Sequence, residues 1–162
     1  MSRTLIAKVE DKPGVLTRVA SMFRRRAYNI ESLTVGHTEQ PGVSRMTIVV
    51  ESDKAKAEIV AHNLYKLVNV IEVEDVTDKP IVVRDLALIK VKTNGGGRSE
   101  VMQLVETFRA RVVDVGLDSL TVEVTGTEDK IDGLVEVLRP FGILEMVRTG
   151  RVAMVRGSGN GK

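Results

Sequence analysis

Side chains that could act in catalysis or hold a metal are scarce in this sequence. The chain of 162 residues contains two histidines, His37 and His62, and no cysteine. Without a thiol, neither histidine belongs to a recognisable ligand or nucleophile motif, and we expect each to be a surface or packing residue. The carboxylates Glu72, Glu74 and Asp75 fall on a predicted edge strand, where charges more often prevent aggregation than transfer protons. The sequence therefore predicts no catalytic site and no metal site.

The composition is that of a folded globular protein. Hydrophobic residues make up 43% of the chain, charged residues 28%, and the formal net charge is only +2, so the chain is neither disordered nor strongly basic. The absence of cysteine fits a reducing compartment, and no apolar run approaches the roughly 20 residues that a transmembrane helix needs. Residues 1–5 also lack a signal-peptide pattern. We therefore expect a cytoplasmic protein without a membrane partner.

A run of three arginines, Arg24 to Arg26, raises the question of nucleic-acid binding. Sheet-based RNA-binding modules stack bases on aromatic side chains that the sheet displays. This chain has three Phe, two Tyr and no Trp, and Phe23, Tyr65 and Phe108 all fall on predicted helices. No nucleic-acid partner is expected. The arginines instead fit the C-terminal end of a helix, where the helix dipole favours cations, or a protein-contact surface.

Two glycine-containing segments could hold an anion at the start of a helix. Residues 11–16, Asp-Lys-Pro-Gly-Val-Leu, join a predicted strand to a predicted helix, and the same residues also make an ordinary strand-to-helix turn. Residues 94–99, Asn-Gly-Gly-Gly-Arg-Ser, precede another predicted helix but lack the lysine and the spacing of a phosphate-binding loop. We favour a mobile connector for the second segment. For the first, the residues alone leave both interpretations open.

Hydrophobic periodicity places these segments between regular elements. In residues 3–10 every second side chain is apolar, as in a half-buried strand, and from Val15 onward the period becomes helical. A second helix is predicted to begin after Asp53, which can cap it. Further strands are predicted over residues 29–38, 43–51 and 70–76. The order of the first half is therefore β-α-β-β-α-β.

The same order begins again after the polar segment 77–80. Strands are predicted over residues 84–93, 112–115, 120–125, 141–148 and 151–156. One helix follows the glycine segment, and another is predicted to be capped by Thr127 and stopped by Pro140. The predicted fold class is α+β: two tandem ferredoxin-like (βαββαβ) domains at residues 1–78 and 79–156, antiparallel sheets with helices on one face, and a flexible tail at 157–162.

Several segments in combination resemble one protein family. Residues 11–16 resemble the ligand-binding signature of ACT domains, small regulatory modules that bind amino acids. Residues 26–35 (RAYNIESLTV) and 44–48 (SRMTI) look like the small subunit of acetohydroxyacid synthase, also called acetolactate synthase. The second half agrees at residues 86–91 (LALIKV), 108–110 (FRA), 113–115 (VDV) and 148–150 (RTG). The resemblance covers nearly the whole chain and implies that the first domain is an ACT domain.

The resemblance implies a regulatory protein and not an enzyme. In this family the small subunit carries no active site and no cofactor of its own, whereas the large subunit uses thiamine diphosphate, FAD and Mg²⁺ to condense pyruvate with a second 2-oxo acid. The small subunit stimulates that enzyme and makes it sensitive to end-product valine in the biosynthesis of valine, leucine and isoleucine. The implied partners are the large subunit, a second copy of this chain in a homodimer, and a branched-chain amino acid, with valine as the allosteric ligand.

The resemblance also implies where the ligand binds. In the family two ACT domains pair, and the loop of one faces the start of the second strand of the other. The matching residues are Gly14, Val15 and Leu16 of one chain, with Asn29 and Ile30 of its partner. N–H groups at the start of a helix lack helical partners and suit a carboxylate, and Ile30 would offer apolar surface to an isopropyl group.

Asp11 completes the expected site and departs from the asparagine that valine-sensitive members of the family often have. An aspartate can accept the ammonium group of an amino acid, but it also places a negative charge near the ligand's carboxylate. Two alternatives therefore stay open. The chain could be an amino-acid-responsive regulator of another kind, or an assembly subunit that activates an enzyme without sensing valine.

Overall fold

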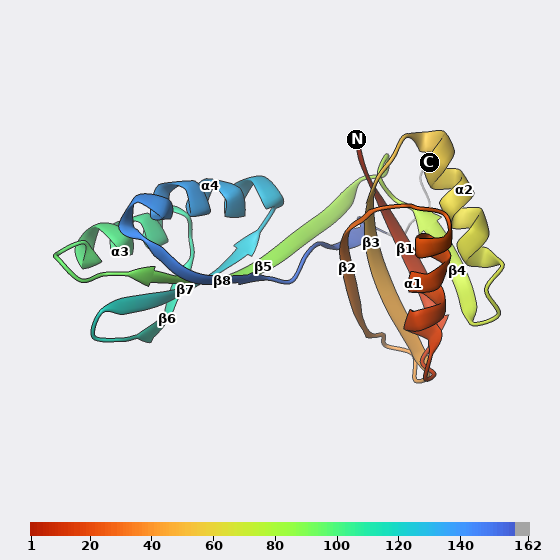
Figure 1. Cartoon of the computed structure of the whole chain (residues 1–162), viewed down its shortest axis with the longest axis horizontal. Coiled ribbons are helices and arrows are strands. Elements are labelled where there is room, and N and C mark those ends of the chain that lie inside the picture. The colour runs from red at the N-terminus through yellow and green to blue at the C-terminus, as the bar shows by residue number, and fades with distance from the viewer. Residues whose placement is uncertain (158–162) are drawn as a thin grey trace. The chain divides into compact units, whose positions relative to one another are not determined.

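The computed structural model describes residues 1–157 (Figure 1). Its elements in chain order are β1 (Ser2–Glu10), α1 (Val15–Arg25), β2 (Ile30–His37), β3 (Val43–Glu51), α2 (Lys54–Tyr65), β4 (Val70–Asp75), β5 (Ile81–Lys92), α3 (Arg98–Thr107), β6 (Arg111–Val115), β7 (Ser119–Gly126), α4 (Glu128–Leu138), the 3₁₀ turn η1 (Arg139–Phe141), β8 (Ile143–Arg148) and β9 (Val152–Val155). Apart from Gly157, the expected tail 157–162 lies outside the described residues. Within that described part, no helix is long and apolar enough to cross a membrane.

The chain forms two compact units. Within the described residues, the first consists of Met1–Val82 together with residues 151–157, and the second is Val83–Gly150. The boundary between Val82 and Val83 falls inside β5. The division into functional domains at residues 1–78 and 79–156 stays a prediction.

The first unit is built on a four-stranded sheet in the order β2-β3-β1-β4, in which every neighbouring pair is antiparallel. Helices α1 and α2 lie on one side of this sheet, as Figure 1 shows. The alternating residues Leu5, Ala7 and Val9 of β1 are buried there, and they form one core with Phe23 of α1 and Leu64 of α2. The predicted βαββαβ order and the predicted fold class are confirmed.

The second unit is built on a sheet in the order β6-β7-β5-β8, covered on one face by α3 and α4 (Figure 1). This sheet has a fifth strand, β9, which also pairs with β5. Its core includes Ile89 of β5, Leu120 of β7, and Ile131 and Leu134 of α4, all of them fully buried. Arg148 of β8 donates hydrogen bonds to Asp132 (2.6 Å) and Asp85 (3.3 Å).

Two predicted helix caps have different outcomes. Asp53 is the N-cap of α2, and its carboxylate accepts the Lys56 N–H at 2.8 Å, which satisfies one of the N–H groups that a helix start leaves free. Thr127 occupies the N-cap position of α4, but its side chain makes no capping hydrogen bond. Two acidic residues in the first turn of α4 favour that helix start electrostatically instead.

The face of the first sheet that points away from the helices is also buried. Thr4 and Ile6 on β1, and Thr47 and Val49 on β3, are each at most 5% exposed. A two-layer ferredoxin-like unit would leave this face in water. Another segment of the first unit must therefore shield it.

The chain from Arg151 to Arg156 lies against this face. Arg45, which points from β3 toward it, donates a hydrogen bond to the Ala153 carbonyl at 2.7 Å. Arg151 donates to the Thr4 hydroxyl at 2.9 Å. The last strand therefore contacts the first unit and also pairs with β5, and its expected place at the end of the second domain stays a prediction. Hydrophobic alternation identified the strand but carried no information about its distant partners.

The first residues of β1 are held by a buried ion pair. Arg3 donates to Asp75 at 2.7 Å and to Asp78 at 3.0 Å, and the arginine itself is only 5% exposed. Burial works against the charged form of Asp75, but hydrogen bonds from Thr77 and Arg3 outweigh it and hold the pKa of this carboxyl below its usual value. Asp75, expected on an edge strand, is therefore a structural partner of Arg3.

A substitution at Ala153 tests the packing of β9. We expect Ala153→Leu to lower the free energy of unfolding by about 1–3 kcal/mol, because extra methylene groups at a position only 5% exposed force its neighbours apart. The adjacent Val152→Leu is the control, since Val152 is 45% exposed, and its effect should be close to zero. Urea denaturation of both variants measures the difference. Equal stability of the two variants would contradict the packing described here.

Candidate functional site

The loop between β1 and α1 is shaped by Gly14. This residue is the N-cap of α1 and has φ 84°, in the left-handed region that glycine adopts without strain. A Cβ built on Gly14 would meet no atom within 4 Å. The backbone at the start of the helix is therefore open to a molecule approaching from outside.

The N–H groups of Gly14, Val15 and Leu16 were expected to lack partners within the helix. The Val15 N–H donates to the carbonyl of Lys12, in the preceding turn, at 3.4 Å. For Gly14 and Leu16, no backbone acceptor lies within reach in residues 1–157. Of the three expected N–H groups, those of Gly14 and Leu16 therefore remain to bind a carboxylate.

The two apolar side chains at the start of α1 differ in exposure. Val15 is buried in the core, whereas Leu16 is 47% exposed. Leu16 thus places an apolar side chain beside its own free N–H group. An amino acid with an aliphatic side chain would find both kinds of contact at this position.

Asp11 lies next to a histidine that the sequence had given no role. The His37 Nδ1 atom at the end of β2 is 3.5 Å from the Asp11 Oδ2 atom, and the two form an ion pair when the imidazole is protonated. The Asp11 N–H donates to the Gly42 carbonyl at 2.9 Å, which fixes the backbone of Asp11. The direction of β2, which is parallel to β1, brings His37 here.

A chain of polar side chains supports the loop from the other side. Arg18 of α1 donates to the Asn69 carboxamide oxygen. The Asn69 amide group donates to Glu10 at 3.2 Å, and Glu10 also accepts from Lys12 at 2.7 Å. The hydrogen bonds from Lys12 and then Asn69 lower the pKa of Glu10. No short motif in the sequence signals this chain, because Asn69 joins it only through the fold.

Asn29 and Ile30 lie at the opposite end of the same sheet. Ile30 is paired with Val50, which in turn is paired with Arg3 near the start of β1. The loop, in contrast, follows Glu10 at the end of β1. A strand rises about 3.3 Å per residue, so the seven positions from Arg3 to Glu10 correspond to roughly 23 Å.

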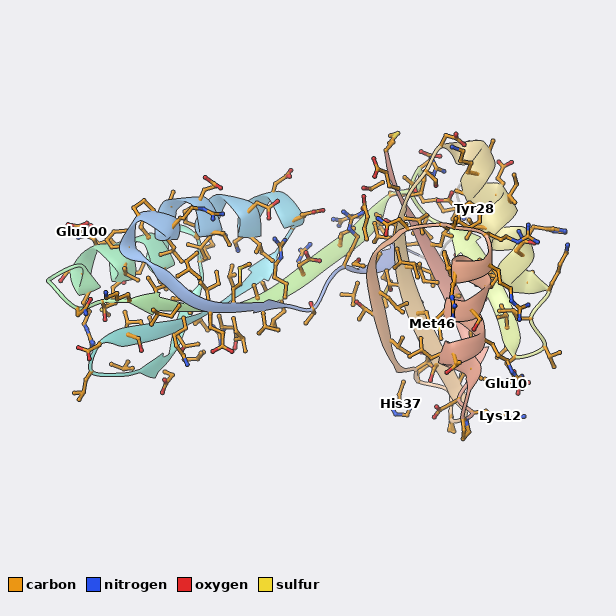
Figure 2. All side chains as sticks on the ribbon, viewed as in Figure 1. Glu10, Lys12, Tyr28, His37, Met46 and Glu100 are labelled. Atoms are coloured by element: carbon orange, nitrogen blue, oxygen red, sulfur yellow. The ribbon has the colours of Figure 1, made fainter. Side chains whose placement is uncertain are left out.

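Figure 2 shows this separation. Tyr28, the residue before Asn29, lies at one end of the first unit, whereas Lys12 and His37 lie at the other end. One chain therefore brings together Asp11, Gly14 and the start of α1, but not the second group of expected residues. The predicted contribution of Asn29 and Ile30 from a partner chain stays a prediction.

Among the described residues no group of three or more His, Cys, Asp or Glu side chains could hold a metal ion. His37 lies on β2 and His62 on α2. The loop between β1 and α1 has groups that could contact a small zwitterion. They are N–H donors for a carboxylate, the Asp11 carboxylate for an ammonium group, and the exposed side chain of Leu16.

Two family models match the chain. Residues 5–72 match a model described as the AHAS small subunit-like ACT domain, and residues 84–157 match the small subunit of acetolactate synthase.

Relatives and a solved structure agree with the family models. The probable acetolactate synthase small subunit of Archaeoglobus fulgidus is 51% identical over 98% of this chain and 99% of its own length. The acetolactate synthase small subunit of Mycobacterium leprae is 52% identical over 96% of this chain and 92% of its own length. A crystal structure of the acetolactate synthase small subunit from Thermotoga maritima superposes with a TM-score of 0.90, at 38% identity, over 97% of this chain and 98% of that one.

The conformation of Gly14 gives a test that needs no ligand. We expect Gly14→Ala to lower the free energy of unfolding by about 1–2 kcal/mol, because alanine is strained at a positive φ even where its Cβ meets no atom. Gly36→Ala is the matched control: a Cβ there also meets nothing within 4 Å, but Gly36 has no positive φ. Denaturant unfolding of both variants is the measurement. A Gly14→Ala protein as stable as the Gly36→Ala protein would rule out the left-handed turn.

Proposed function

Because the chain belongs to the family of acetolactate synthase small subunits, we propose that it regulates a separate catalytic large subunit and has no active site of its own. The observation that carries the proposal is the open start of α1, where the Gly14 and Leu16 N–H groups are without backbone acceptors in residues 1–157. In an ACT domain, such a place suits the carboxylate of an amino acid. We also propose that the chain works in the cytoplasm.

The ligand we propose is a branched-chain amino acid, with valine as the end product that inhibits. Its carboxylate would accept hydrogen bonds from Gly14 and Leu16, and its ammonium group would lie near the Asp11 carboxylate. The exposed side chain of Leu16 would contact the isopropyl group. Asp11 lies beside His37, whose protonated form would offset part of its negative charge.

We propose that a homodimer completes the site. β2 is an edge strand of the first sheet, and its free edge can pair with another strand. If two copies of β2 pair antiparallel about a two-fold axis and overlap over their full length, Ile30 of one copy comes opposite His37 of the other. Asn29 and Ile30 of the second copy would then approach Asp11 and Gly14 of the first. Each dimer would contain two such sites.

The catalytic partner would hold thiamine diphosphate, FAD and Mg²⁺, and this chain would supply no group to the reaction. Its contribution would be allosteric. Valine would bind more tightly to one state of the complex than to the other and would shift the population toward that state. The alternative that the chain only assembles and activates the enzyme, without sensing valine, is an outcome of the experiment below.

The Gly14→Asp variant separates inhibition from stimulation. The aspartate adds a negative charge where the ligand's carboxylate must bind and removes at least one charge-assisted hydrogen bond, worth about 1.5–3 kcal/mol. We expect the valine concentration for half-inhibition of the reconstituted enzyme to rise at least about tenfold. Stimulation of the large subunit should be retained. Acetolactate formation at increasing valine concentration measures both quantities.

Gly95→Asp is the matched control for this variant. Gly95 has φ 85°, and a Cβ there also meets nothing within 4 Å, so it carries the same backbone strain and the same added charge in the second unit. We expect Gly95→Asp to keep normal valine inhibition. A Gly14→Asp enzyme that stays as sensitive as the wild type would contradict the site. A wild-type enzyme that is stimulated but insensitive to every branched-chain amino acid would favour the assembly subunit.

Mixing two defective chains tests whether the site is shared between copies. We expect Gly14→Asp and Asn29→Ala each to weaken valine binding when present alone. In a mixed dimer, one site would carry both substitutions and the other neither, so about half of the dimers in a random mixture would regain one intact site. Calorimetric titration of the refolded mixture with valine should therefore recover tight binding at about a quarter of the sites.

The two pure variants, refolded in the same way, are the controls for the mixture. Recovery in the mixture but in neither control supports a shared site. A mixture that binds valine no better than its components shows that each chain carries a complete site, and a monomeric mass at micromolar concentration with valine present would exclude the dimer.

A further inference from the structure

A second hollow lies on the helical side of the first unit, over α1 and α2. Its volume is about 550 Å³, within the range of small-molecule sites. The lining includes four cationic side chains, Arg18, Arg25, Arg26 and Lys66, and no carboxylate. It is separate from the loop at Gly14, which contributes no residue to it.

The cations of this hollow have little compensation from within the protein. In the described part of the chain, Arg25, Arg26 and Lys66 form no ion pair, whereas Arg3 and Lys8 of the same unit do. Glu58 borders a neighbouring hollow that Arg26 and Lys66 also line, but it forms no ion pair with either. Like charges gathered around one space repel each other. An anion in the hollow would remove that repulsion.

The helix dipole explains only part of this arrangement. Arg25 and Arg26 lie at the C-terminal end of α1, and Lys66 is the C-cap of α2, where cations are favoured. Arg18, in contrast, lies within the first half of α1. Two helices thus contribute cations to the wall of one hollow. The helix dipoles do not account for this gathering of cations.

Polar groups without charge complete the wall. Ser21 of α1 offers a hydroxyl, and Asn63 of α2 lines the hollow although it is only 5% exposed. The Asn63 amide group donates to the Ile59 carbonyl at 2.9 Å, and Arg18 is held by Asn69. Held side chains lose less entropy when they bind a ligand. Arg18 and Asn63 are therefore positioned in advance, whereas the exposed Arg25, Arg26 and Lys66 would become ordered when an anion binds.

We propose that this hollow binds a small molecule with two adjacent phosphate groups. Guanidinium groups bind phosphate oxygens through paired hydrogen bonds, and a diphosphate carries enough charge to balance several cations. A free amino acid does not fit, because its ammonium group would meet cations and no carboxylate. The hollow is thus a second site, with a ligand chemistry different from that of the loop at Gly14.

Pyrophosphate is the probe that tests this proposal. We expect pyrophosphate, at constant ionic strength, to bind the wild-type chain in a calorimetric titration and to raise its unfolding temperature with concentration. The double variant Arg25→Gln/Lys66→Gln should bind at least about tenfold more weakly, since it loses two charge-assisted contacts. Inorganic phosphate should bind the wild type more weakly than pyrophosphate does.

Arg24→Gln is the matched control. Arg24 is an exposed arginine of the same helix that does not line the hollow, so its loss removes one of the two charges that the double variant loses, but no contact. We expect the Arg24→Gln chain to bind pyrophosphate within about threefold of the wild type. Circular dichroism and the unfolding temperature without ligand show whether each variant keeps its fold.

Three outcomes would overturn the proposal: no binding of pyrophosphate to the wild type, equal loss of binding in Arg24→Gln and in the double variant, or equal stabilisation by sulfate at the same ionic strength. A fourth outcome would assign the surface to a protein partner instead. In that case the double variant would fail to stimulate the large subunit, and the wild type would not bind pyrophosphate.

Discussion

The direction of strands in the first sheet constrains how the proposed ligand site could be assembled. β1 and β2 are both antiparallel to β3, so they run the same way. The loop after β1 and the residues before β2 therefore lie at opposite ends of a rigid sheet. A site that uses both ends must involve another chain. Ligand binding and association then stabilise each other, because a ligand that contacts two chains binds the pair more tightly than either chain alone.

The second constraint is the burial of both faces of that sheet. Ile6 and Val49 are covered although no helix lies on their side, and the chain from Arg151 contributes to this cover through Arg45 and Thr4. The second unit is consequently an insertion between two segments of the first. Both ends of the inserted unit continue directly into structure of the first unit.

Local chemistry was sufficient to predict most of the fold, but not its long-range contacts. The alternation of Leu5, Ala7 and Val9 identified a strand, and the glycine at position 14 identified the turn. The same alternation suggested one solvated face, whereas Ile6 is buried on the other side. The contact between Asp11 and His37 depends on strand direction, and the Val15 N–H is bound by a carbonyl of its own turn. Neither follows from residue type or spacing.

The two proposed ligand sites of the first unit are connected through Arg18. Arg18 lines the basic hollow and also donates to Asn69, and the hydrogen bonds continue through Glu10 to Lys12 in the ligand loop. An anion that drew the Arg18 guanidinium away would leave the Asn69 carboxamide oxygen without that donor and would loosen the support of the loop. By linkage, a ligand that stiffened the loop would change the affinity of the hollow by the same factor. Most of these side chains reach solvent, which weakens their interactions. The chain of hydrogen bonds could therefore adjust the affinity for an amino acid only to a small extent.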